Sequence, residues 1–151
     1  MKNKGKTVAR LSAIQALYLK DSQELAADDA YNEFLAYHLP TKSHQDLVAP
    51  DIELLKKIFY GILARREEIH QLIKDNLPPE WHFDRLEVML KIILECACFE
   101  IISSLDLHAK IILNEYVNIA SSYFSQKETV FVNGVLNSIA RKYRPESFAQ
   151  N

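Results

Sequence analysis

Apolar residues recur at spacings of three and four along most of this chain, a pattern typical of helices that bury one face. The 151 residues include only three glycines and five prolines, which leaves few turn signals for β-hairpins. The strongest break is the pair Pro78 and Pro79, because two adjacent prolines cannot continue a helix. The sequence therefore predicts an all-α fold in a single domain, 1–151, with helical halves at about 1–77 and 80–145.

The stretch "TVFVNGVLNSIARKY", residues 129–143, contains the pair most at odds with this pattern, Asn133 and Gly134. Asn-Gly between apolar runs is a strong hairpin signal, whereas a glycine inside a helix costs about 1 kcal/mol relative to alanine. The apolar residues recur every three or four positions, which favours the helix: Val132, Val135, Leu136, Ile139 and Tyr143. We therefore expect a helix over 128–142, with Gly134 where another helix or a ligand backbone approaches closely.

The same periodicity predicts the remaining elements. Helices are expected from about Thr7, over 29–38, over 51–75, along 86–101 with Asp84 as cap, over 108–124 and over 127–143, with a loop at 40–50. The helix along 86–101 is apolar at nearly every position, so it is predicted to be the central one. Its residues Glu87, Lys91 and Glu95 lie four apart and are expected to form one narrow solvated strip.

Motifs for catalysis and metal binding do not occur in the sequence. The five histidines are scattered, and there is no HExxH or CxxC motif and no glycine-rich phosphate loop. We therefore expect no enzyme activity, no cofactor and no metal. Cys96 and Cys98 lie in an apolar helical run, where we expect them to be buried and reduced. The absence of a signal-peptide pattern and of a long uncharged apolar segment predicts a cytoplasmic protein.

The distribution of charge is more informative than the net charge of −2, which by itself argues against a nucleic-acid binder. All charged residues among the first twenty are positive: Lys2, Lys4, Lys6, Arg10 and Lys20. A second candidate cluster near the other end comprises Arg141, Lys142 and Arg144. Cations aligned at a helix start can follow a phosphate backbone. These residues alone leave RNA, DNA and an acidic protein open as partners.

Four segments together resemble the NusB family of bacterial transcription factors: "RLSAIQALY" from residue 10, "RLEVMLKIILECACFEI" from residue 85, "NEYVNIA" from residue 114 and "FVNGVLNSIAR" from residue 131. The resemblance implies two small helical bundles packed side by side, in which Gly134 packs against a helix. Asn114 and Asn133 would then bond backbone groups between helices. It further implies binding to boxA RNA together with NusE, a small-subunit ribosomal protein, in the RNA polymerase antitermination complex that supports ribosomal RNA operons.

Individual residues suit these implied roles. The residues expected to contact RNA are Lys2, Lys4, Lys6, Arg10, Lys127 and Phe131. The residues expected to meet the basic NusE are Asp84, Glu87 and Glu95. Glu95 and Lys127 depart from the family, which commonly has an arginine and an acidic residue there, and a plain solvated position stays an alternative for each. The competing function is a helical protein-interaction module without RNA affinity, and the oligomeric state, a homodimer included, stays open.

Overall fold

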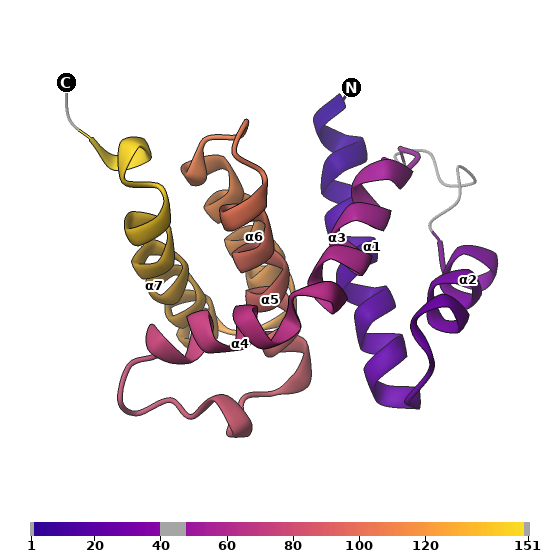
Figure 1. Ribbon diagram of the computed structural model, residues 1–151, viewed down its shortest axis with the longest axis horizontal. Coiled ribbons are helices and arrows are strands. Elements are labelled where there is room, and N and C mark those ends of the chain that lie inside the picture. Colours follow the sequence, from indigo (N-terminus) through magenta and orange to yellow (C-terminus); the bar gives the residue numbers. More distant parts are fainter. Residues whose placement is uncertain (1, 40–47, 150–151) are drawn as a thin grey trace. The chain divides into compact units, whose positions relative to one another are not determined.

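The computed structural model describes residues 2–39 and 48–149, without the side chains of residues 2 and 3 (Figure 1). Every regular element within those ranges is a helix, which confirms the predicted all-α fold. The chain divides into two compact units, residues 1–64 and residues 65–151. Among the helices in the described ranges, none is long and apolar enough to cross a membrane.

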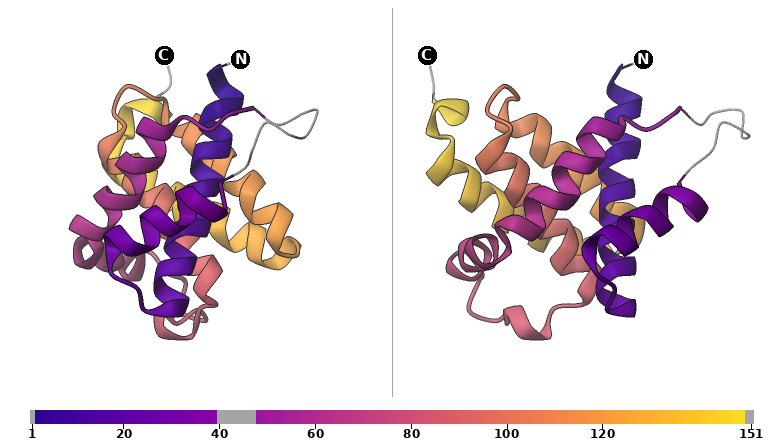
Figure 2. Two further views of the ribbon diagram at one scale, coloured as in Figure 1. Left: turned by 90° about the vertical axis from the view of Figure 1, so that its right-hand side faces the viewer. Right: turned by 45° about the vertical axis from the view of Figure 1, so that its right-hand side comes forward.

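The first unit contains three helices, α1 (Lys2–Gln23), α2 (Ala27–Tyr37) and α3 (Ile52–Ala64). Helix α1 packs against both α2 and α3 (Figures 1 and 2). The largest fully buried side chains of this unit come from all three helices: Ile14, Leu17, Phe34, Leu55, Ile58, Phe59 and Ile62. Their spacing is that of an apolar stripe, so burial of this stripe accounts for the bundle.

Gly5, in the first turns of α1, is closely approached by another backbone segment. A Cβ atom added there would lie 3.1 Å from the carbonyl oxygen of Ala49, and the N–H of Asp51 donates to the Gly5 carbonyl at 3.0 Å. The close contact ties the start of α1 to the segment that leads into α3. Helix α1 begins at Lys2, whereas the sequence predicted a start near Thr7.

The second unit consists of α4 (Arg66–Asp75), the short 3-10 helix η1 (Phe83–Arg85), α5 (Val88–Ser103), α6 (Ala109–Tyr123), α7 (Gln126–Tyr143) and the 3-10 helix η2 (Pro145–Phe148). Helix α5 packs against α4, α6 and α7, and α6 and α7 also pack against each other (Figure 1). Residues 92–101 of α5 are all buried. The prediction that this helix is central, made from its nearly continuous apolar sequence, is confirmed.

Two boundaries differ from the sequence prediction. The expected helix over 51–75 is two helices, because Arg65 between them has φ −125° and ψ 22°, outside the helical region. The compact units accordingly divide after Ala64, while Pro78 and Pro79 lie inside the second unit. The cap of α5 also differs: Glu87 occupies the N-cap position, and Asp84 lies in η1.

The structure changes the interpretation of the Asn133–Gly134 pair. The predicted helix over 128–142 is confirmed, since α7 spans the whole range. However, Gly134 is exposed, and a Cβ atom added there would meet nothing within 4 Å, so the predicted helix contact was wrong. Asn114 and Asn133 are exposed as well, rather than bonding between helices. The Asn133 side chain accepts instead from Asn137, one turn further along α7.

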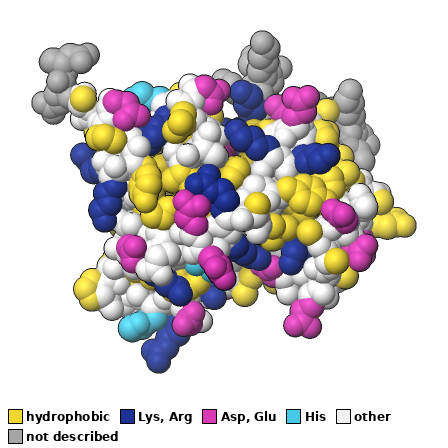
Figure 3. Space-filling model, in the orientation of Figure 1, with side chains coloured by type: hydrophobic (Ala, Val, Ile, Leu, Met, Phe, Trp, Pro, Cys, Tyr) yellow, Lys and Arg dark blue, Asp and Glu magenta, His cyan; other side chains and the backbone are white. Residues whose placement is uncertain are grey.

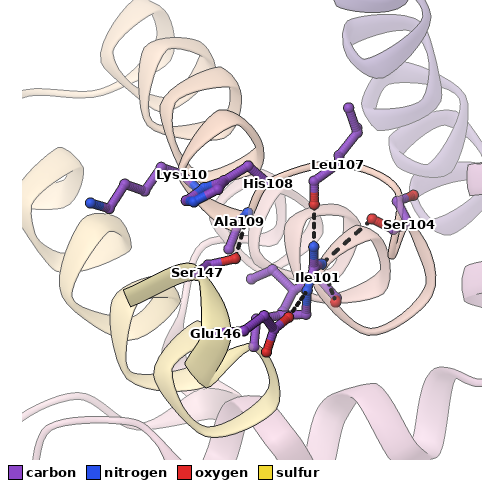
Figure 4. A network of polar contacts seen from close by, with 9 residues as sticks. Ile101, Ser104, Leu107, His108, Ala109, Lys110, Glu146 and Ser147 are labelled. Atoms are coloured by element: carbon purple, nitrogen blue, oxygen red, sulfur yellow. Dashed lines mark hydrogen bonds and ion pairs between the residues drawn. The ribbon is translucent and has the colours of Figure 1, made fainter. Parts of the chain in front are cut away.

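Arg144, part of the second predicted basic cluster, is a buried structural residue. Its guanidinium donates to the carbonyl oxygens of Ile101 at 3.0 Å and Ser104 at 3.5 Å and to that of Leu107 (Figure 4). It also pairs with the Glu146 carboxylate at 3.2 Å. Carbonyl groups at a helix C-terminus have no partner within the helix. Arg144 therefore satisfies the end of α5 and the loop that follows, and it is unsuited to a surface role.

Candidate functional site

Trp81, Phe131 and Lys127 form an aromatic and cationic cluster on the second unit. The rings of Trp81 and Phe131 are stacked, with centroids 3.9 Å apart and planes inclined by 22°. The Lys127 ammonium lies 5.6 Å from the Trp81 ring centroid. Phe131 is only 6% exposed, whereas Trp81 is partly exposed and Lys127 is exposed. The sequence prediction placed Phe131 on the surface, but the structure offers the Trp81 indole there instead.

Local structure holds this cluster in place from two sides. On one side, the backbone N–H of Trp81 donates to the Pro78 carbonyl at 3.0 Å, which closes a tight turn that contains the two prolines. On the other side, Ser125 and Glu128 form a capping box that fixes the start of α7. Lys127 and Phe131 are four residues apart on α7, so both side chains lie on the same helix face.

Glu95 lies inside an ion-paired group on the second unit. It is 1% exposed, and its carboxylate accepts from Arg66 at 2.6 and 3.0 Å and contacts His70 Nε2 at 2.5 Å. Burial by itself would raise the pKa of Glu95, but the hydrogen bonds from His70 and Arg66 and their charges outweigh it, so the pKa is lowered. The predicted solvated position for Glu95, open to a basic partner, was therefore wrong.

The other acidic residues predicted to meet a partner are accessible. Asp84 in η1 and Glu87 at the start of α5 are both exposed. On the face drawn in Figure 3, basic and acidic side chains are interspersed rather than gathered into large patches of one sign. On that face, an electrostatic contact with a partner would therefore depend on small local groups of charged side chains.

The basic residues of α1 differ in accessibility. Lys4 is exposed and Lys6 is partly exposed, whereas Arg10 is only 2% exposed. The expectation of a surface Arg10 on a phosphate path was wrong, because the helix carries this position into the interior. The side chain of Lys2 lies outside the described residues.

Two cysteines and the histidines add no further chemistry. Cys96 and Cys98 are both buried, as predicted, and burial raises the pKa of the Cys98 thiol to about 12. At ordinary pH this thiol is therefore protonated and a weak nucleophile. Among the residues that the structure describes, no group of three or more His, Cys, Asp or Glu side chains could hold a metal ion.

Trp81 is the site residue that the sequence reasoning missed. It follows "NLPPE", a stretch interpreted only as a helix stop. A tryptophan two residues after a pair of prolines follows a constrained backbone and lies outside any apolar helical stripe, so it was a signal for an aromatic side chain held at the surface.

A sequence profile described as the NusB family matches residues 7–141. The chain belongs to the NusB family. Its curated relatives include the transcription antitermination protein NusB of Gluconobacter oxydans, 32% identical over 143 residues that cover 92% of this chain and 88% of the relative. The protein of the same name from Bartonella quintana is 34% identical over 138 residues, covering 90% of this chain and 88% of the relative.

A solved structure supports the fold of this NusB-family chain. It is a complex of the antitermination factors NusB and NusE with double-stranded RNA, and one of its chains superposes with a TM-score of 0.77. The match covers 95% of this chain and 100% of that chain, at 24% sequence identity. At this identity the likeness establishes the helical fold.

Proposed function

We propose that this chain is a transcription antitermination factor that binds the single-stranded boxA element of RNA together with NusE, in support of ribosomal RNA operon transcription. The observation that carries the proposal is the Trp81 indole, partly exposed, backed by Phe131 and flanked by the Lys127 ammonium. Single-stranded RNA is bound by stacking its bases on aromatic rings while cations follow its phosphates.

The lysines of α1 supply additional phosphate contacts in this proposal. Lys4 and Lys6 lie on the first turns of a helix whose start is tied down at Gly5. Side chains on an ordered helix lose less conformational freedom on binding than side chains on a frayed terminus. Lys2 belongs to the same proposed group, and Arg10 does not, because it is buried.

For NusE, we propose that Asp84 and Glu87 provide an acidic contact for its basic surface. Both side chains are exposed and lie three residues apart in sequence, Asp84 in η1 and Glu87 at the N-cap of α5. Changing both to lysine should slow association with NusE and alter its salt dependence, as charge reversal at an interface rim does. Asp106→Lys, at another exposed position of the second unit, is the control. Equal effects of the two changes would remove Asp84 and Glu87 from the interface.

RNA binding can be tested through the single tryptophan of the chain, which is Trp81. A base that stacks on Trp81 should quench its fluorescence during titration with boxA RNA, and a scrambled RNA should bind more weakly. Trp81→Ala should weaken binding, measured by fluorescence anisotropy of labelled RNA, by about 1 to 3 kcal/mol. Tyr143→Ala removes an aromatic residue that is 49% exposed elsewhere on α7, and it should have no effect. RNA binding without quenching, or equal losses for the two variants, would contradict the proposed site.

The helical interaction module without RNA affinity makes the opposite prediction. In that case NusE would bind the chain, and boxA RNA would neither quench Trp81 nor increase the affinity for NusE. Titrating RNA with and without NusE therefore separates the two functions in one experiment.

A further inference from the structure

The ammonium groups of two lysines lie close to the aromatic ring of Phe83. This residue follows Trp81, the proposed stacking residue, by two positions in the sequence. The ammonium of Lys74, from α4, lies 5.3 Å from the Phe83 ring centroid, and that of Lys91, from α5, lies 5.1 Å from it. The Phe83 ring also contacts the His70 ring, with centroids 4.7 Å apart. Two helices, α4 and α5, thus contact this ring, and each of them brings a positive charge to it.

The charges along this part of α4 and α5 are balanced at one end and unbalanced at the other. Helix α4 presents Arg66, His70 and Lys74 four residues apart, and α5 presents Lys91 and Glu95 four residues apart. Glu95 pairs with Arg66 and His70. One turn away along each helix, Lys74 of α4 and Lys91 of α5 both lie beside the Phe83 ring. At this position two positive charges are neighbours, and no carboxylate of the described residues pairs with them as Glu95 pairs with Arg66 and His70.

Neither lysine of this pair has a carboxylate partner among the described residues. Glu87 lies four residues before Lys91, yet no ion pair joins them, and Lys74 likewise forms no ion pair with a described carboxylate. The ring face attracts both ammonium groups, which offsets part of their mutual repulsion. Folding therefore leaves a concentrated positive charge that an anion with several oxygens would relieve.

We propose that Lys74 and Lys91 bind phosphates of the same RNA strand whose base stacks on Trp81. Phe83 follows Trp81 by two residues, which limits the separation of the two backbone positions to about 7 Å. His82 between them is extended and exposed, so an RNA strand that crosses this residue passes from the Trp81 indole to the lysine ammonium groups beside the buried Phe83 ring. The segment 81–83 thus joins a stacking surface to a phosphate-binding pair. This inference rests on the proposed function and extends its site.

The test compares two charge-neutralised pairs of matched chemistry in the full chain. Lys74→Gln with Lys91→Gln removes the proposed contacts while keeping most of each aliphatic stem on Phe83. The control is Lys56→Gln with Lys57→Gln, because both lysines are exposed on α3 and neither was predicted to contact RNA.

The readout is the salt dependence of binding to labelled single-stranded boxA RNA, with circular dichroism to check that each variant is folded. Each lost phosphate contact should reduce the slope of log affinity against log salt by about 0.7, so the Lys74 and Lys91 pair should reduce it by about 1.4. Between 50 and 200 mM salt the parent should then lose about sevenfold more affinity than this variant. The control pair should leave the slope unchanged.

The outcomes separate this inference from the proposed function. If the parent binds RNA and Trp81 is quenched, but the Lys74 and Lys91 variant keeps the parental slope, only the phosphate-binding pair is overturned. Equal slope changes for both pairs would also overturn it, since they would show an effect of the protein's net charge rather than specific phosphate contacts. If the parent binds no RNA, the proposed function fails, and this inference fails with it.

Discussion

Replacing Glu95 with glutamine should destabilise the protein, although the two side chains are almost equal in size. The carboxylate is 1% exposed and accepts two hydrogen bonds from Arg66 and one from His70. Glutamine offers one oxygen and one NH2 group, and that NH2 would face donors. The variant therefore removes the negative charge that faces Arg66 and His70, and it places two sets of donors against each other.

The size of this effect follows from how deeply the group is buried. Breaking a buried ion pair by removing one partner costs about 3 to 5 kcal/mol. Arg66 is 24% and His70 is 32% exposed at the side chain, so water recovers part of the loss. We therefore expect Glu95→Gln to lower the free energy of unfolding by about 2 to 4 kcal/mol at pH 7. The melting temperature should fall by roughly 2 to 4 °C for each kcal/mol.

The pH dependence of this loss is a separate check. Because the folded-state pKa of Glu95 is lowered, its ionisation stabilises the fold above the unfolded pKa of about 4.3. That contribution disappears as the pH falls through the lower folded pKa, so the stability difference between parent and variant should shrink on acidification. Urea denaturation at several pH values measures it, with Glu67→Gln, at an exposed position of α4, as control. A Glu95→Gln loss as small as that of Glu67→Gln would refute the buried ion pair.

Three other substitutions test the packing. Gly134→Ala should stabilise the protein by about 0.5 to 1 kcal/mol in urea denaturation, since the added Cβ meets nothing within 4 Å and alanine is the better helix former; a loss would restore the helix-contact interpretation. Gly5→Val should destabilise by about 1 to 3 kcal/mol, because its Cβ would lie 3.1 Å from the Ala49 carbonyl oxygen; parental stability would show that the segment yields. Arg144→Met should cost about 3 kcal/mol by leaving buried carbonyls unbonded, with an unchanged melting temperature as the contrary result.

Local sequence was sufficient wherever a helix is defined by its own residues. The apolar periodicity placed α6 and α7 within a residue or so of their observed ends, and it identified α5 as central from its lack of a polar face. It also favoured a helix over a hairpin at Asn133 and Gly134. The repeat of 3.6 residues is a short-range property, so it can be read without knowing what lies on the other side of the helix.

Only the tertiary structure decided what each polar or aromatic residue does. Glu95 has the spacing of a solvated strip, but two side chains from α4, 25 and 29 residues earlier in sequence, convert it into a buried ion pair. From the sequence, Arg144 was interpreted as a surface cation. In the structure it donates hydrogen bonds to carbonyl oxygens at the end of α5, some 40 residues earlier in the chain. Phe131 reads as a candidate for base stacking until Trp81 covers it. Periodicity indicates which face of a helix is buried. The role of a charged or aromatic side chain depends instead on partners that are distant in sequence, and only the fold brings those partners into contact.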